Sequence, residues 1–300
     1  MNLTNQLILS VMELFPRPVV RRFAMRYIAG EQLDDAVRVV RALNSKKMMG
    51  MIDVLGENVS TREESSAAIR ECEEVLHSIN KNRIDANLSI KLTQFGLKID
   101  EEFCYFNVKR LIEMASGYSS FVRIDMEDSS TTSATLKLYE RLRSDGFENV
   151  GVVIQANMRR SEKDVERLIS MKANVRLCKG AYIEPEGTAF RDREGIRSNF
   201  LKLLKMLLEG KCYVGIATHD EFLINGAYRY IRERNLQKSD YEFQMLYGVR
   251  SKLRDQIVAD GHRLRVYVPF GQHWYAYSMR RFKENPEMVR YILRAFLSGD

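Results

Sequence analysis

The chain has 300 residues, of which 45% are hydrophobic and 29% charged, which is the composition of a soluble globular protein. Its excess of seven positive charges permits contact with an anionic surface without specifying one. No apolar run approaches the roughly 20 residues of a membrane-spanning helix, and four dispersed cysteines without a signal peptide predict a reduced protein on the cytoplasmic side.

The first 45 residues predict helices that precede the main domain. Residues 1–30 have the spacing of an amphipathic helix interrupted at Pro16 and Pro18. A second helix is expected from about Glu31 to Leu43. We therefore divide the chain into an N-terminal helical segment, residues 1–45, and a barrel domain, residues 46–300, whose fold is argued next.

From residue 49 onward, short apolar runs alternate with amphipathic helical segments. Eight runs have the length of strands: MGMIDVLG, ANLSIKL, FVRIDM, VGVVIQA, VRLCKG, VGIATH, EFQMLY and RVYVPF. Helical patterns lie between them, for example at residues 66–79, 134–147, 163–172 and 196–210. Such alternation predicts a parallel sheet, and eight repeats of it predict an α/β fold, a closed (β/α)8 barrel of the TIM type. A doubly wound open sheet is the alternative, but no GxGxxG follows the first strand.

Polar residues recur on the face of these strands that should line the barrel. In the second and third strands, alternation with aliphatic residues places Lys91, Arg123 and Asp125 inside. The same reasoning assigns these further residues to the interior: Asn87, Ser89, Glu127, Gln155, Arg176, Glu242, Gln244, Arg265 and Tyr267. Burying unpaired charges is costly, so the set must pair internally or face a ligand. A closed ion-pair network at the barrel bottom is one interpretation; the charges at strand carboxyl ends favour an active site.

Two short motifs follow strands directly. KGAY, residues 179–182, offers Gly180 and Ala181, which let backbone approach a planar or phosphorylated ligand, although glycine at a strand end is also ordinary turn chemistry. ATHD, residues 217–220, ends the sixth strand with a histidine. Its Thr218 or Asp220 could simply cap the next helix.

The four histidines show no metal-ligand spacing, and we expect no metal site. Lys91 could act as a Schiff-base nucleophile, but Asp125 beside it favours a charged, ion-paired lysine. Near the chain end, Trp274 begins a helix whose next turns carry Arg280, Arg281 and Glu284. Arginine suits bidentate capture of a carboxylate or phosphate, whereas a solvated charge patch is the simpler reading.

Taken together, the motifs resemble a known family in order and spacing. KLTQFG, VRIDMEDS, VIQAN, VRLCKGAY, ATHD, EFQMLYGVR and RVYVPFG…WYAYSMRRFKENPE are similar to the proline dehydrogenase family, and most of all to its short monofunctional bacterial enzymes. The resemblance runs from about Leu88 to Phe296. It implies a (β/α)8 barrel with non-covalent FAD that oxidises L-proline to Δ1-pyrroline-5-carboxylate, the first step of proline catabolism to glutamate.

The resemblance also implies partners and a place in the cell. The electrons would pass to membrane quinone, and a separate pyrroline-5-carboxylate dehydrogenase could take the product. We expect a cytoplasmic protein in peripheral contact with the inner face of the membrane, and no nucleic-acid partner. Two rivals stay open: a lysine-based aldolase on the same fold, and a basic scaffold for acidic lipid or nucleic acid.

Carried over by motif, the family's residues fall into three groups. Asp125 would hold Lys91 and line the site, and Arg176 would lie against the reactive nitrogen of the flavin; both count as catalytic. The substrate would be bound by Lys91, Tyr267, Tyr277, Arg280, Arg281, Leu246 and Glu284. The cofactor would be bound by Met126, Gln155, Arg176, Lys179, Gly180, Ala181, Thr218 and His219.

Overall fold

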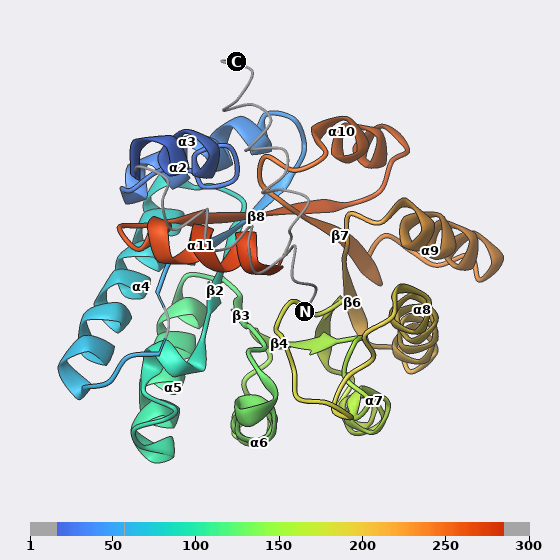
Figure 1. Cartoon of the computed structure of the whole chain (residues 1–300), viewed down its shortest axis with the longest axis horizontal. Coiled ribbons are helices and arrows are strands. Elements are labelled where there is room, and N and C mark those ends of the chain that lie inside the picture. Colours follow the sequence, from blue (N-terminus) through green and yellow to red (C-terminus); the bar gives the residue numbers. More distant parts are fainter. Residues whose placement is uncertain (1–16, 57, 285–300) are drawn as a thin grey trace.

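The computed structural model describes residues 17–56 and 58–284. Its strands form a closed parallel barrel in chain order (Figure 1). The strands are β1 (Met49–Val54), β2 (Ala86–Ile90), β3 (Val122–Ile124), β4 (Val150–Gln155), β5 (Asn174–Cys178), β6 (Tyr213–Ala217), β7 (Tyr241–Leu246) and β8 (Leu264–Phe270). β8 pairs with β1 from Met49↔Arg265 to Val54↔Phe270 and closes the ring. The predicted (β/α)8 barrel is confirmed.

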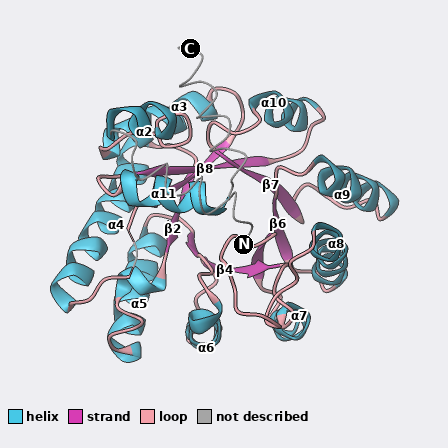
Figure 2. Ribbon diagram, in the orientation of Figure 1, coloured by secondary structure: helices cyan, strands magenta, loops and turns pink. Residues whose placement is uncertain are grey.

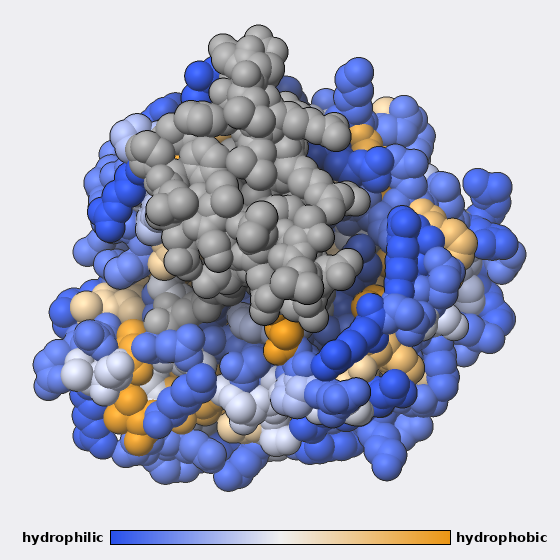
Figure 3. All heavy atoms as spheres, viewed as in Figure 1, coloured by the Kyte–Doolittle hydropathy of each residue, from blue (hydrophilic) through white to orange (hydrophobic). Residues whose placement is uncertain are grey.

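Helices surround the barrel between successive strands (Figure 2). They are α4 (Arg62–Asn82), α5 (Glu101–Gly117), α6 (Ser129–Ser144), α7 (Ser161–Ser170), α8 (Arg193–Glu209), α9 (Glu221–Glu233) and α10 (Ser251–Ala259), with a short 3-10 helix, η1 (Leu92–Phe95), after β2. Side chains just before several of them accept hydrogen bonds from the first turn, as Asp128 and Asp220 do. Hydrophilic side chains dominate the described part of the face shown in Figure 3.

The N-terminal helices and the last helix depart from the regular ring. α3 (Leu33–Asn44) packs against β1 and β8, where Val40 lies so close to Gly50 that a Cβ there would meet its Cγ2 at 2.8 Å. α11 (Trp274–Glu284) instead lies across the barrel mouth and contacts α2 (Arg17–Ala24) (Figure 1). The expected helix within residues 1–16 lies outside the described residues, and a domain boundary at residue 46 stays a prediction.

The apolar core lies between the barrel and its helices, not inside the barrel. Outward-facing strand residues such as Ile52, Leu88, Ile124 and Ile216 are at most 1% exposed. Their inward-facing neighbours in the sequence are largely polar. This confirms the predicted alternation, in which helices cover the aliphatic face and polar groups line the interior.

A self-contained polar cluster fills the lower part of the barrel. Arg265 Nε lies 2.7 Å from Glu242 Oε1, and both side chains are buried. Arg123 donates to the carbonyl oxygens of Val152 and Asn174 at 3.0 and 2.7 Å. Gly151 leaves room for it, since a Cβ there would lie 2.3 Å from the guanidinium. The interpretation of a closed ion-pair network is therefore right for Arg265 and Glu242, whereas Arg123 bonds the backbone and keeps its buried Nε without a partner among the described residues.

Breaking this cluster should destabilise the fold. Glu242→Gln leaves Arg265 buried without its carboxylate, and loss of one member of a buried pair costs about 3–5 kcal/mol. We expect a loss of this size in the free energy of unfolding by urea denaturation. Glu162→Gln is the matched control, because it removes only an exposed pair with Lys202 and should cost less than ~1 kcal/mol. Equal losses in the two variants would contradict the assignment.

Candidate functional site

A cavity of about 280 Å³ opens at the carboxyl ends of the strands, where α11 covers the barrel. All predicted site residues whose side chains the structure describes line it. They are Lys91, Asp125, Met126, Gln155, Arg176, Lys179, Gly180, Ala181, Thr218, His219, Leu246, Tyr267, Tyr277 and Arg281. The side chains of Arg280 and Glu284 lie outside the described part of the chain. The structure thus brings the predicted groups together, while their roles stay predictions.

Asp125 is the centre of a buried cluster in this cavity. Its Oδ2 accepts a hydrogen bond from the Tyr267 hydroxyl at 2.7 Å, and its Oδ1 accepts one from Arg176 at 3.2 Å. The Arg176 guanidinium also lies over the Tyr267 ring, 4.7 Å from its centre. Burial, together with Asp125 and Asp53, raises the pKa of Tyr267 well above its ordinary value. The hydroxyl therefore stays protonated and donates to the carboxylate.

The ion partner of Lys91 differs from the one expected. Lys91 Nζ lies 2.6 Å from Oδ1 of Asp53, which is 1% exposed, whereas Asp125 is engaged by Arg176 and Tyr267. The expectation that Asp125 holds this lysine is corrected to Asp53, at the end of β1. Burial raises the pKa of Asp53, and Lys91 opposes that shift. The strand alternation that located Lys91 would have found Asp53, because Met49, Met51 and Asp53 share one face of β1.

The loop after β3 is held by Gln155 and Glu127. Gln155 Nε2 donates to the backbone oxygen of Glu127 at 2.9 Å. The Glu127 carboxylate accepts from the Thr93 amide and hydroxyl at 3.1 and 2.5 Å. Glu127 was expected inside the barrel, but β3 ends at Ile124 and the alternation ends with it. Met126 can line the cavity for the same reason.

The turn after β5 approaches a neighbouring loop closely. Gly180 has φ +98°, and a Cβ there would lie 2.0 Å from Oδ1 of Asn157. The backbone N–H of Asn157 donates a hydrogen bond to the backbone carbonyl oxygen of Lys179 at 2.8 Å. Only glycine fits this combination of conformation and contact. Backbone, rather than a side chain, therefore faces the ligand at this edge of the cavity.

His219, at the end of β6, is held as a neutral ring. Its Nε2 accepts a hydrogen bond from the Leu246 amide at 2.9 Å, so the ring carries its proton on Nδ1. Burial, then the nearby cations Lys179 and Arg176, lower its pKa to about 4. Asp220 caps α9 and pairs with Arg197 at 2.8 Å. The capping interpretation is thus right for Asp220, while His219 faces the cavity.

α11 supplies the wall opposite the strands. Tyr277 is 5% exposed and lines the cavity, with Leu246 at the end of β7 nearby on the lining. The Arg281 guanidinium lies 5.1 Å from the centre of the Tyr277 ring. Further lining residues that the sequence did not mark are Val153, Cys178, Tyr182, Ala217 and Met245. Tyr182 and Ala217 lie in the KGAY and ATHD motifs without having been singled out there, and Val153, Cys178 and Met245 carry no sequence signal that separates them from core positions.

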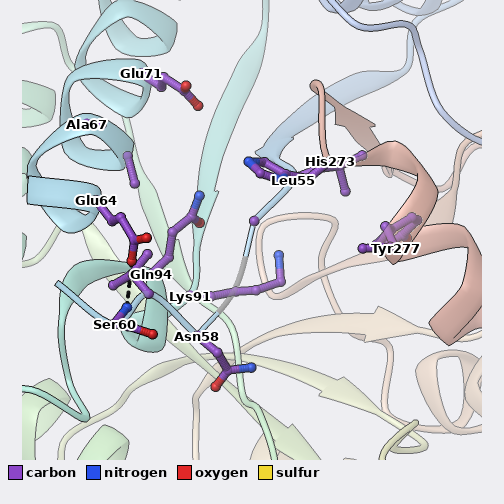
Figure 4. Close-up of a pocket in the computed structure, with 14 residues that line it drawn as sticks. Leu55, Asn58, Ser60, Glu64, Ala67, Glu71, Lys91, Gln94, His273 and Tyr277 are labelled. Carbon is purple, nitrogen blue, oxygen red and sulfur yellow. Dashed lines mark hydrogen bonds between the residues drawn. The ribbon is translucent and has the colours of Figure 1, made fainter.

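A second cavity, of about 440 Å³, adjoins the first at Lys91 and Tyr277, which line both. Its walls come from the segment after β1, from α4 and from the start of α11. Glu71 and His273 reach toward it from opposite sides (Figure 4). The sequence did not point to this cavity, because most of its lining, from residues 55–60 and from α4, comes from segments outside the recognised motifs.

Neither a metal-binding cluster nor a membrane-spanning helix occurs in residues 17–56 and 58–284. These residues contain no group of three or more His, Cys, Asp or Glu side chains placed to hold a metal ion. None of the helices they form has the length and hydropathy that crossing a membrane requires. All four cysteines are free thiols, of which Cys72, Cys104 and Cys212 are buried.

Comparison with known proteins gives one consistent result. The family described as "Proline dehydrogenase" matches residues 36–292. "Proline dehydrogenase 1" of Bacillus subtilis subsp. natto is 36% identical over 91% of this chain and 90% of its own length. "Proline dehydrogenase" of Deinococcus radiodurans is 33% identical over 96% and 94%. A crystal structure of proline utilization A from Bdellovibrio bacteriovorus, inactivated by N-propargylglycine, superposes with a TM-score of 0.82 at 25% identity, covering 88% of this chain and 33% of that one.

The depressed pKa of His219 predicts a pH dependence of stability. Between pH 6.5 and about 4 the unfolded histidine binds a proton that the folded ring does not, so stability is lost as pH falls through this window. His219→Gln keeps an acceptor for the Leu246 amide but does not titrate. We expect the wild type to lose about 1 kcal/mol per pH unit more than the variant in this range. Parallel pH profiles of the free energy of unfolding would contradict the assignment.

Proposed function

Since the chain belongs to the proline dehydrogenase family, and is thereby an oxidoreductase of proline catabolism, we propose that it transfers a hydride from L-proline to bound FAD and yields Δ1-pyrroline-5-carboxylate. Membrane quinone is the proposed electron acceptor, and a separate pyrroline-5-carboxylate dehydrogenase the proposed consumer of the product. The proposal includes peripheral contact with the inner face of the membrane, where such a quinone resides.

One observation carries this proposal: two sets of predicted residues face each other across one cavity. The cofactor set comes from β4, β5 and β6 with the turns that follow them, and from Met126 after β3. The substrate set comes from β2, β3, β7, β8 and α11. Hydride transfer requires substrate and acceptor to be held in contact and in a fixed orientation. A cavity lined by both sets supports that arrangement.

The residues on the cofactor side fit a flavin. Arg176 Nε is buried and has no hydrogen-bond partner among the residues that the structure describes, so it is available to a flavin ring nitrogen. His219 has Nδ1–H to donate, since Nε2 is already used by Leu246. The Gly180 turn offers backbone at close range. FAD would supply hydride acceptance and electron storage, and a fixed cation such as Arg176 stabilises the negative charge that this creates.

On the substrate side, the chain can balance both charges of proline. Arg281, with the predicted Arg280 and Lys91, would bind the carboxylate. Loss of hydride from C5 leaves an iminium, and the Asp125 carboxylate stabilises the positive charge that develops. Tyr267 and Tyr277 would enclose the ring and exclude water. No side-chain nucleophile is needed.

The lysine-based aldolase has weaker support. A Schiff-base lysine must become neutral to attack a carbonyl, whereas Lys91 lies 2.6 Å from the buried Asp53 carboxylate. That pairing favours the charged ammonium. Lys179, the other candidate, lies 3.8 Å from Asp220 with its side chain 45% exposed, so it lacks the desolvated pocket typical of a Schiff-base lysine.

An absorption spectrum tests the proposal directly. We expect the purified protein to be yellow and to bleach when L-proline is added without oxygen, because reduction removes the visible absorption of an oxidised flavin. The same addition of glycine is the control and should leave the spectrum unchanged. A colourless protein that borohydride traps with a carbonyl substrate would instead identify the aldolase.

The carboxylate clamp predicts a large loss of efficiency in two variants. Arg280→Met and Arg281→Met each remove a cation that fixes the substrate, and kcat/KM for L-proline in a dye-coupled assay should fall by about 30-fold or more. Arg232→Met, on the outer helix α9, is the control and should stay near wild type. If either site variant stays within about threefold, which is under ~1 kcal/mol, that arginine does not clamp the substrate.

A further inference from the structure

The second cavity is separate from both proposed sets of ligand contacts. The predicted cofactor residues lie after β3 and on β4 to β6 with their turns, whereas this cavity is lined from the segment after β1, from η1, from α4 and from the start of α11. It meets the first cavity only through Lys91 and Tyr277 among the described lining residues. A molecule bound there would lie beside the substrate, on the side away from the cofactor turns.

A buried amide faces this cavity without a partner. Gln94, in η1, is 4% exposed and lines the cavity. Its side-chain amide forms no hydrogen bond with any residue in the part of the chain that the structure describes. Figure 4 shows the amide directed into the space between α4 and the start of α11. The amide has two N–H donors, so a ligand carbonyl oxygen in this space could accept a hydrogen bond from it.

The lining favours a neutral, partly apolar ligand. Leu55 and Ala68 are buried in its wall, and Ala67 and Ala276 add apolar surface nearer the rim. No arginine occurs among the described lining residues, the lining lysine Lys91 is paired with Asp53 at 2.6 Å, and Glu64 and Glu71 on α4 add negative charge. These carboxylates oppose an anionic or carboxylate-bearing molecule such as an amino acid. A flat ring with carbonyl acceptors matches both the apolar wall and the donor amide.

We propose that this second cavity binds the ring of the quinone acceptor, and that Gln94 donates a hydrogen bond to one of its carbonyl oxygens. The proposal rests on the proposed function and gives its electron acceptor a place. The reaction balances: oxidation of one proline to Δ1-pyrroline-5-carboxylate releases two electrons and two protons, and one quinone takes up both to become a quinol. Glu71 and His273, exposed at the rim, connect the ring to solvent for proton exchange.

The test compares two cavity variants with the wild-type holoenzyme, using ubiquinone-1 as the probe. Ala67→Phe fills the cavity from an exposed helix position, and Gln94→Leu removes the amide at similar volume. Both should raise KM for ubiquinone-1 by about 10-fold or more. Quenching of the single tryptophan, Trp274, by ubiquinone-1 should weaken equally, which reports binding without turnover. Arg70→Phe, exposed on α4 but outside the cavity, is the matched control and should resemble wild type.

The two half-reactions separate the possible outcomes. Anaerobic bleaching by L-proline, and turnover with ferricenium in place of quinone, should stay within about twofold of wild type in every variant. An unchanged KM for ubiquinone-1 in both cavity variants would overturn the proposal. Slower bleaching with normal quinone kinetics would also overturn it, because the cavity would then be a route for proline. Absence of bleaching in the wild type would refute the proposed function, whereas tryptophan quenching would still test quinone binding.

Discussion

The arrangement of side chains at the mouth of the barrel depends on the carboxylate of Asp125. It is buried at the end of β3 and accepts hydrogen bonds from Tyr267 of β8 and Arg176 of β5. One buried anion thus fixes side chains from strands on different sides of the ring, and Arg176 gains a second contact with the Tyr267 ring. Without this anion the Arg176 guanidinium would be buried and unbalanced, which is costly enough to rearrange the site. The hydrogen bond to Asp125 therefore holds the Arg176 guanidinium in place at the wall of the cavity.

The charged side chains inside the barrel form two levels: a lower level deep in the barrel, and an upper level at the carboxyl ends of the strands, beside the cavity. In the lower level, Arg265 and Glu242 form a buried ion pair, and Arg123 donates to backbone carbonyl oxygens. Arg123 and Arg176 each keep a buried Nε without a partner among the described residues, but only Arg176 lines the cavity at the barrel mouth. The lower level closes the barrel, and the upper level places polar groups along the cavity. The structural-network interpretation is right for the Arg265–Glu242 pair, and the active-site interpretation stays a prediction for the upper level.

α11 contributes side chains to both cavities. Because α3 occupies the outer position beside β1 and β8, the last helix is free to lie across the mouth, where Tyr277 and Arg281 reach the cavity. Tyr277 and Lys91 line both the first and the second cavity. That arrangement places a candidate acceptor site next to the candidate substrate site, so that both half-reactions would use opposite sides of the same few residues.

The sequence by itself determined the barrel and most of the candidate site. Eight apolar runs alternating with amphipathic segments are enough to predict a (β/α)8 fold, and period-two alternation located Lys91, Asp125 and Arg176, because side chains on successive strand positions point to opposite faces. Tertiary structure alone decided which charges pair. Lys91 binds Asp53 rather than Asp125, because Asp125 is engaged by Tyr267 of β8 and Arg176 of β5, contacts that exist only in the closed ring. The tertiary structure alone revealed the second cavity, because its lining residues range from Leu55 to Tyr277, more than two hundred positions apart in the chain. The alternation within a strand determines whether a side chain points into or out of the barrel. Which inward side chains then meet depends on how the eight strands are arranged around the closed ring.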